Sequence, residues 1–375
     1  MRIAVVGPAH PYKGGSAQHT TALAHQLSAA GHDVWLESWR RQYPGFLYPG
    51  VLTVDEPEGD LFASTGRSLD WYRPDGWWRT GRRLAAAGHE AVVIALFTPV
   101  QVPAYLALAR AARAGGARVV ALCHNVLPHE RRRFDRPAMK AMLRAVDAVV
   151  VHAAAEAELA ASLTSVQVEV APLPLHLPGT ETAGTPDPDG RLQRNRLLFF
   201  GMVRQYKGVD VLLRALAGTR AEVALTIAGE IWEGRAELLG LITELRLGNR
   251  VTVNDGYLPT AAIPGLFASA DALVLPYRSG TASQNALIAF QFGLPVIATR
   301  AGAVAEAVEP GVSGLLCAPG DVADLTRAID ELYAPGVLAA LQRGVRAPDT
   351  KLAWENYVAA IEHASSSGHS RIAVG

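Results

Sequence analysis

LLFFGMVRQYKGVDV, residues 197–211, is the stretch that bears most directly on the fold: an apolar run ends at a glycine, and a second glycine opens a helical pattern. Gly201 lets the backbone turn closely beneath a ligand. Between the glycines, Arg204 supplies a planar guanidinium and Lys207 a mobile ammonium. A helix from Gly208 presents free N–H groups to an anion. Taken alone, the segment fits a phosphate site and also an ordinary strand-to-helix loop with two solvated cations.

A second segment, residues 273–321, repeats this design: an apolar strand ends at Pro276, and a loop of small residues leads to a helix that starts near Ser283. Backbone amides and hydroxyls in such a loop are suited to phosphate oxygens at a helix N-terminus. Ser283 is equally a candidate N-cap. The predicted phosphate-binding residues of this loop are Thr281, Ala282 and Ser283.

Short apolar runs alternate with helical stretches along the rest of the chain, which predicts parallel strands joined by crossover helices. The pattern breaks at residues 173–195, which are rich in Pro, Gly, Thr and Asp, so we place an interdomain hinge there. The sequence therefore predicts two doubly wound α/β sheets, one before the hinge and one after it. The predicted strands are 2–7, 33–38, 91–97, 118–124, 148–153 and 168–172 before the hinge, and 197–201, 223–230, 251–257, 272–277, 295–300 and 314–319 after it.

These patterns predict an N-terminal domain over 1–180, a C-terminal domain over 181–348, a closing helix over 349–364 and a disordered tail over 365–375. The apolar set of the closing helix is Leu352, Trp354, Tyr357, Val358 and Ile361. The first crossover helix places Ala17, Leu23, Ala24 and Leu27 on one face and ends at Gly31.

The composition is that of a globular protein with a large core: 375 residues, 50% hydrophobic and 19% charged. Thirty-five basic residues balance 35 acidic ones, so global charge does not favour nucleic acid as a partner. The two cysteines, Cys123 and Cys317, do not indicate a disulfide framework. The N-terminus resembles a first buried strand rather than a targeting segment, so we expect a cytoplasmic protein.

Residues 91–109 are uncharged for long enough to suggest a membrane span. Pro99 and Pro103 divide this segment, however, and its first part is rich in valine and isoleucine. We therefore predict a buried strand, a proline turn and a helix.

Together the segments resemble retaining glycosyltransferase family 4, and the resemblance extends over about residues 1–333. PYKGGSAQHT (11–20), RQYPGFLYPG (41–50) and CHNVLPHE (123–130) resemble a bacterial subgroup found around polysaccharide and secondary-metabolite pathways. The resemblance implies a GT-B fold: two Rossmann-like domains face a central cleft, and a terminal helix crosses back to the first domain. It also implies that the second domain binds the nucleotide sugar and the first binds the acceptor.

Further site residues follow strand ends, where open parallel sheets bind ligands. Gly14 and Gly15 precede the first helix and would allow close approach to a phosphate or acceptor. The resemblance places His124 near the donor sugar, although a structural hydrogen bond explains it too. For Asn125, His129 and Glu130, capping or loop stabilisation is as good an explanation as a role in binding. Glu306 stands where the family usually has glutamate, but a helix-surface charge fits as well.

The chain departs from the family at two positions. Many members carry two glutamates eight residues apart, and the second binds the nucleotide ribose; here those positions hold Gly280 and Ile288. The bacterial subgroup that this chain resembles also lacks both glutamates, so their absence does not imply an inactive protein. Ribose recognition is left to nearby polar candidates, Gln284, Asn285 and Gln291.

A basic region over residues 131–144 contains Arg131, Arg132, Arg133, Arg136, Lys140 and Arg144. It fits a solvated face, and it also fits a patch against anionic lipid at the inner membrane face, which would suit a lipid-linked acceptor.

The resulting prediction is a retaining glycosyltransferase of hexosyltransferase type. It would move a sugar from a nucleotide diphosphate sugar, with UDP or GDP, to a glycan, lipid-linked or small-molecule acceptor. Arg204 and Lys207 would stabilise the leaving diphosphate, so no metal cofactor is expected.

Alternatives are a non-hydrolysing sugar-nucleotide epimerase of the same fold, or a catalytically silent glycosyltransferase-like partner protein. The sequence lacks a GxGxxG or P-loop signature after either first strand, which counts against a nicotinamide or flavin oxidoreductase and an NTPase.

Overall fold

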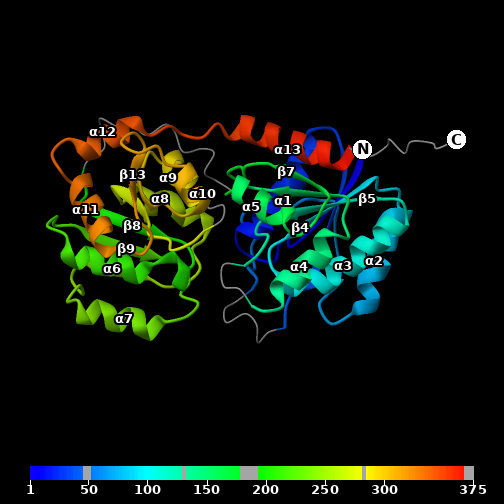
Figure 1. Ribbon diagram of the computed structural model, residues 1–375, viewed down its shortest axis with the longest axis horizontal. Coiled ribbons are helices and arrows are strands. Elements are labelled where there is room, and N and C mark those ends of the chain that lie inside the picture. The colour runs from blue at the N-terminus through cyan, green and yellow to red at the C-terminus, as the bar shows by residue number, and fades with distance from the viewer. Residues whose placement is uncertain (45–51, 129–131, 178–192, 281–283, 367–375) are drawn as a thin grey trace. The chain divides into compact units, whose positions relative to one another are not determined.

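The computed structural model describes residues 1–44, 52–128, 132–177, 193–280 and 284–366. The chain forms two compact units, which Figure 1 shows in a blue-to-red gradient. Unit 1 comprises Met1–Leu177 and Thr350–Gly375, and unit 2 comprises Pro178–Asp349. The sequence predicts these divisions after residues 180 and 348.

Unit 1 is built on a seven-stranded sheet in which every neighbouring pair is parallel. The strand order is β3-β2-β1-β4-β5-β6-β7, so the chain winds outward in both directions from β1 and β4. The strands are β1 (Arg2–Val6), β2 (Asp33–Arg41), β3 (Thr65–Asp70), β4 (Ala91–Leu96), β5 (Arg118–Cys123), β6 (Ala148–Val151) and β7 (Gln167–Val170).

The edge strand β3 was not predicted, because its sequence, TGRSLD, is mostly polar. A buried carboxylate stabilises its pairing with β2. Glu37 is fully buried and accepts hydrogen bonds from the Ser68 backbone N–H at 2.8 Å and its hydroxyl at 2.7 Å. Arg83 of helix α2 (Pro74–Ala86) forms an ion pair with the same carboxylate. The edge strand therefore depends on a polar network rather than on apolar periodicity.

Helices cover both faces of this sheet and produce two apolar cores. One core packs beneath α2 (Pro74–Ala86), α3 (Val102–Ala114) and α4 (Asp135–Leu143). The other lies beneath α1 (Gly15–Ala29) and α13 (Thr350–Ser366). Two further helices of unit 1 lie in the described residues, η2 (Pro99–Gln101) and α5 (Ala154–Ala161). The predicted core face of α1 is confirmed, with Ala17, Leu23, Ala24 and Leu27 all buried.

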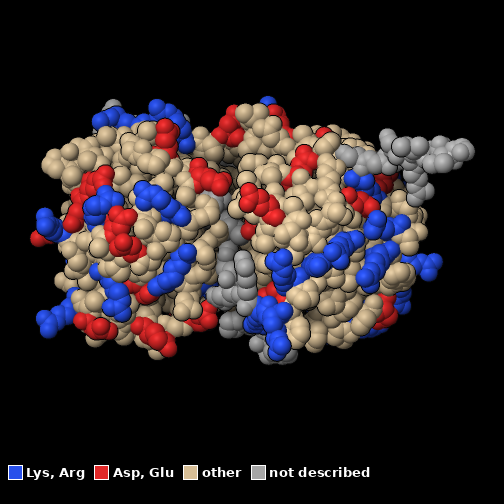
Figure 2. All heavy atoms as spheres, in the orientation of Figure 1, with Lys and Arg blue, Asp and Glu red and all other residues tan. Residues whose placement is uncertain are grey.

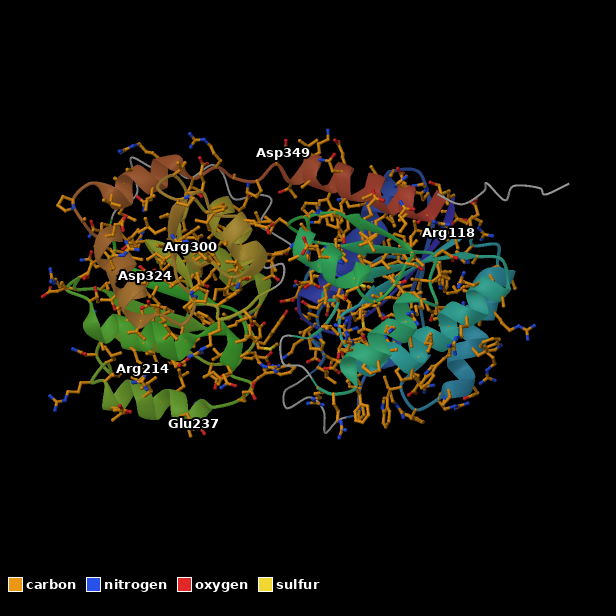
Figure 3. The ribbon with its side chains drawn as sticks, viewed as in Figure 1. Arg118, Arg214, Glu237, Arg300, Asp324 and Asp349 are labelled. Atoms are coloured by element: carbon orange, nitrogen blue, oxygen red, sulfur yellow. The ribbon has the colours of Figure 1, made fainter. Side chains whose placement is uncertain are left out.

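The closing helix α13 packs against β4, β5, β6 and β7 of unit 1. Its apolar set is confirmed for Trp354, Tyr357, Val358 and Ile361, but Leu352 is 52% exposed and was wrongly assigned to the buried face. Arg118 of β5, labelled near the end of α13 in Figure 3, donates from Nε to the carbonyl of Ala364 at 2.7 Å.

The uncharged segment 91–109 forms β4, the short helix η2 and the start of α3, as predicted. Across the part of the chain that the structure describes, no helix is both long and apolar enough to cross a membrane.

Unit 2 contains a six-stranded parallel sheet in the order β10-β9-β8-β11-β12-β13. Its strands are β8 (Arg196–Phe200), β9 (Ala224–Ala228), β10 (Val251–Asn254), β11 (Ala272–Leu275), β12 (Val296–Thr299) and β13 (Gly314–Cys317). Its helices are η3 (Gln205–Lys207), α6 (Val209–Gly218), α7 (Arg235–Glu244), η4 (Thr260–Ala262), α8 (Ile263–Ala268), α9 (Asn285–Gln291), α10 (Gly302–Glu306), α11 (Val322–Leu332) and α12 (Val337–Gly344). The prediction of two doubly wound parallel sheets is confirmed.

Candidate functional site

The glycine that ends β8 brings a cation and an amide close to the backbone. Gly201 adopts a φ of 108°, and a Cβ built there would lie 3.3 Å from the Lys207 Nζ and 3.2 Å from the Asn285 Nδ2. A side chain at this position would crowd both groups. Gly201 follows the carboxyl end of β8, a central strand of the sheet. Open α/β folds bind ligands at this edge.

Lys207 ends the short helix η3, with its Nζ 5.4 Å from the centroid of the Tyr277 ring. Burial lowers the pKa of this ammonium group, and the nearby Arg204 cation lowers it further. Among the described residues, no carboxylate forms an ion pair with Lys207. A partly buried cation without a counter-ion is a favourable place for an anion, because desolvation disfavours a lone charge.

Arg204 begins the same turn but is already engaged within the protein. Its Nε donates to the Glu233 carboxylate at 3.0 Å, and its guanidinium carbon lies 5.0 Å from the centroid of the Trp232 ring. Both partners follow strand β9. The side chain is 23% exposed. We call Gly201, Arg204 and Lys207 the diphosphate cradle.

Asn285, the first residue of α9, is hydrogen-bonded to the cradle strand. Its Nδ2 donates to the Phe200 carbonyl at 2.7 Å and to the Tyr277 hydroxyl at 3.2 Å. Gln284 lies just before the helix as its N-cap residue, half-buried, and Ile288 is 3% exposed. The position of the second family glutamate is therefore part of the apolar core in this chain.

Other predicted residues of unit 2 are placed as follows. Thr281, Ala282 and Ser283 lie outside the described residues. Glu306 is exposed at the last residue of α10. Gln291 ends α9 and is half-buried.

In unit 1, the predicted glycine pair leads into α1. Gly14 is the N-cap residue with a φ of 88°, and the Nε2 atom of His176 lies 3.0 Å from the carbonyl oxygen of Gly15. Two strand-end loops, after β1 and after β7, are therefore joined next to the predicted site. The pKa of His176 is lowered to about 4, chiefly by burial.

His124 follows β5, as predicted, but it lies within a group of histidines that sequence reasoning missed. His19, on α1, has its ring centroid 4.6 Å from that of His124 and 4.9 Å from that of His176. His152, after β6, lies 4.8 Å from His124. We call His19, His124, His152 and His176 the histidine cluster.

The histidine cluster is held neutral by its surroundings. Burial, followed by the proximity of the other imidazoles, lowers the pKa of His19 and of His124 well below 6.5. Tyr357 of α13 closes the cluster, with its ring centroid 5.5 Å from that of His19. Over the described residues, no three metal-ligating side chains are arranged to hold a metal ion. The signal in the sequence was a histidine directly after each of β5 and β6, strands that pair as neighbours.

The basic region lies in and around α4, in the helical layer of unit 1 that also contains α2 and α3. Figure 2 shows Lys and Arg side chains gathered over the face formed by α2, α3 and α4. Arg132, Arg133, Arg136, Lys140 and Arg144 are exposed there, and Phe134 is 73% exposed beside them. Arg131, His129 and Glu130 lie outside the described residues, and Asn125 is half-buried.

Family models match both halves of the chain. Residues 13–175 match "Glycosyltransferase Family 4", and residues 194–335 match "Glycosyl transferases group 1". A D-inositol 3-phosphate glycosyltransferase of Acidothermus cellulolyticus is 31% identical over 204 residues, which cover 49% of this chain and 45% of that protein. The enzyme of the same name from Pseudarthrobacter chlorophenolicus is 35% identical over 147 residues, covering 36% and 34%. The chain thus spans less than half the length of these curated relatives.

Solved structures with the same fold cover nearly the whole chain. Sucrose-phosphate synthase from Thermosynechococcus elongatus superposes with a TM-score of 0.71 at 20% identity, covering 97% of this chain and 96% of that one. Anabaena Alr3699/HepE in complex with UDP superposes with a TM-score of 0.70 at 17% identity, covering 97% and 98%. At this identity the likeness shows the fold, which is GT-B. The family models show that both halves of the chain are similar to glycosyltransferase domains, the N-terminal half to family 4; the narrower subgroup stays a prediction.

Proposed function

We propose that this family 4-like chain transfers a sugar from a nucleotide diphosphate sugar to an acceptor, and that the diphosphate cradle of unit 2 binds the leaving diphosphate. One observation carries the proposal: Lys207 is a partly buried cation, its pKa is lowered by burial, and no carboxylate of the described chain pairs with it. A diphosphate would supply the missing counter-charge and would stabilise the ammonium form.

The donor class agrees with the solved relatives. Alr3699/HepE is known in complex with UDP and with UDP-glucose. We therefore infer a UDP- or GDP-linked sugar as donor and a glycan, lipid-linked or small-molecule acceptor. Transfer would retain the anomeric configuration by attack on the face from which the diphosphate departs. A donor phosphate oxygen would take the acceptor proton, so the cradle need only stabilise the developing negative charge.

Two further parts of the proposal concern binding. In place of the carboxylate replaced by Ile288, we propose Gln284 and Asn285 as the ribose partners, since both lie at the start of α9. The exposed basic region, with Phe134 beside it, would place a cytoplasmic enzyme against anionic lipid.

A thermal-shift screen against UDP-, GDP-, TDP- and ADP-sugars tests the donor class, because a ligand that binds only the folded state raises the midpoint of unfolding. We expect one nucleotide series to raise the midpoint of the parent and not that of Lys207→Ala. If no sugar nucleotide shifts the parent, the proposal is wrong.

A second candidate is a catalytically silent glycosyltransferase-like partner. The observation that favours it is the buried Ile288 at the position of a family glutamate. Donor binding without transfer to any acceptor in a broad panel would support the silent partner. Conversion of the sugar nucleotide into its epimer, with no acceptor present, would instead identify an epimerase.

A further inference from the structure

Arg278, in the loop that follows β11, forms a two-pronged ion pair with Asp210 on the first turn of α6. Its Nη1 lies 2.8 Å from Oδ1 of Asp210, and its Nη2 lies 2.6 Å from Oδ2. The side chains are 37% and 46% exposed. An exposed ion pair adds little stability by itself, so its value must come from what the pair holds in place.

The same arginine also binds the turn that contains the cradle cations. Its Nη1 donates to the Gln205 carbonyl at 2.8 Å, and its backbone N–H donates to the Tyr206 carbonyl at 2.7 Å. Arg278 therefore contacts the chain on both sides of Lys207: two residues before it, one residue before it, and three residues after it.

A close backbone contact completes the connection. Gly208 adopts the left-handed conformation with a φ of 66°, and a Cβ there would lie 2.1 Å from the Pro276 carbonyl oxygen. The ring that lies against the Lys207 Nζ belongs to Tyr277, the residue between Pro276 and Arg278. The cation, its aromatic neighbour and the turn are thus aligned by one short segment at the end of β11.

We propose that Arg278 and Asp210 are positioning residues of the diphosphate site: they hold the turn over Gln205–Gly208 so that the Lys207 ammonium meets the diphosphate. This inference rests on the proposed function. Neither side chain has to touch the ligand. Lysine cannot replace Arg278, because a single ammonium cannot reproduce the planar fork that meets both carboxylate oxygens and the carbonyl of Gln205.

A double-mutant cycle between Arg278→Lys and Lys207→Ala tests the proposal, since residues that act through one another give non-additive effects. Turnover and donor KM would be measured for the parent, both single variants and the double variant. The affinity of each for inorganic pyrophosphate would be measured by calorimetry. We expect Arg278→Lys to lower pyrophosphate affinity and turnover by about tenfold in the parent. No further loss is expected in the Lys207→Ala background.

Arg327→Lys is the matched control. Arg327 is likewise an ion-paired arginine of unit 2, but its partners, Asp324 and Glu331, lie on its own helix α11. We expect parental affinity and turnover for this variant. Asp210→Asn provides a second approach and should resemble Arg278→Lys, while the unfolding midpoint of each variant shows that unit 2 stays folded.

The outcomes separate this inference from the proposed function. Equal fold-losses from Arg278→Lys with and without Lys207, or no loss at all, would overturn the positioning role while leaving the glycosyltransferase intact. A parent that binds pyrophosphate through Lys207 but transfers no sugar would overturn the proposed activity alone. Pyrophosphate binding that ignores Lys207→Ala would overturn both.

Discussion

The Nε2 atom of His152 lies 3.2 Å from the Nδ1 atom of His124. The other ring nitrogen of His152 lies 3.1 Å from the carbonyl of Ala171, which can only accept a hydrogen bond. Burial lowers the pKa of His152 to about 4, so at neutral pH the ring carries one hydrogen, on Nδ1. Its Nε2 must then accept from Nδ1–H of His124. The lone pair of His124 is left on Nε2, which has no hydrogen-bond partner among the described residues.

The first prediction is that neutral His124 exists as the Nδ1–H tautomer. Nitrogen-15 chemical shifts of the ring report which nitrogen carries the hydrogen. His152→Phe removes the acceptor, and we expect the Nε2–H form of His124 to become populated. His89, whose Nδ1 lies 2.8 Å from the Leu84 carbonyl outside the histidine cluster, should keep its spectrum. An Nε2–H tautomer in the parent would contradict the assignment.

The second prediction concerns acid stability. The pKa values of the cluster histidines are lower in the folded protein than in the unfolded chain, chiefly because of burial. The unfolded chain therefore binds more protons below its histidine pKa of about 6.5. The free energy of unfolding should be fully present above that pH and decline towards pH 4, by at most about 1.4 kcal/mol per pH unit for each histidine.

Urea unfolding at several pH values checks this decline. His19→Gln should flatten it, because the fully buried His19 no longer takes up a proton on unfolding. His25→Gln, on the same helix but outside the cluster, should leave the slope of the parent. An equal slope in parent and His19→Gln would show that the cluster is not the cause.

The third prediction is that Lys207→Ala and Arg204→Ala each lower turnover by roughly a hundredfold or more, since removing a charge-stabilising donor costs about 3 to 4 kcal/mol. Steady-state kinetics with the donor found by the thermal-shift screen provide the measurement. Arg327→Ala is the control, because the carboxylates that pair with this arginine, Asp324 and Glu331, lie on its own helix α11. Parental turnover in both cradle variants would remove the site.

The fourth prediction is that transfer does not require a metal, because Arg204 and Lys207 supply the positive charge that a divalent cation supplies in other phosphate sites. Turnover should be the same in EDTA and in buffers with Mg²⁺ or Mn²⁺. Loss of turnover in EDTA, with recovery on adding either metal, would count against the cradle as the only source of charge.

The fifth prediction compares two glycines of unit 2. Gly208→Ala should destabilise unit 2 by more than 1 kcal/mol, since its φ is positive and the new Cβ would meet the Pro276 carbonyl. Gly240→Ala should stabilise it by about 0.5 to 1 kcal/mol, because Gly240 lies inside α7 with open space around its Cα. Chemical denaturation measures both, and equal effects would mean that the turn tolerates a side chain.

The sequence alone determined most of the fold. The buried strands are continuous runs of valine, isoleucine, leucine and alanine, and this local signal suffices because both faces of a parallel sheet are covered. The cradle turn was equally readable, since Gly201, Arg204, Lys207 and Gly208 are close in the chain. Strand β3 was not predicted, because it is stabilised by Glu37 of the neighbouring strand β2. The local sequence pattern of β3 does not indicate that contact.

Only the tertiary structure decided which distant side chains meet. The histidine cluster unites residues 19, 124, 152 and 176, because the parallel order of the sheet brings the ends of β5 and β6 side by side and α1 follows β1. Arg278 meets Asp210 across 68 residues for a similar reason, since β8 and β11 are neighbours although the chain visits two strands between them. Such contacts arise from strand order and burial, which the whole fold sets and no single segment encodes.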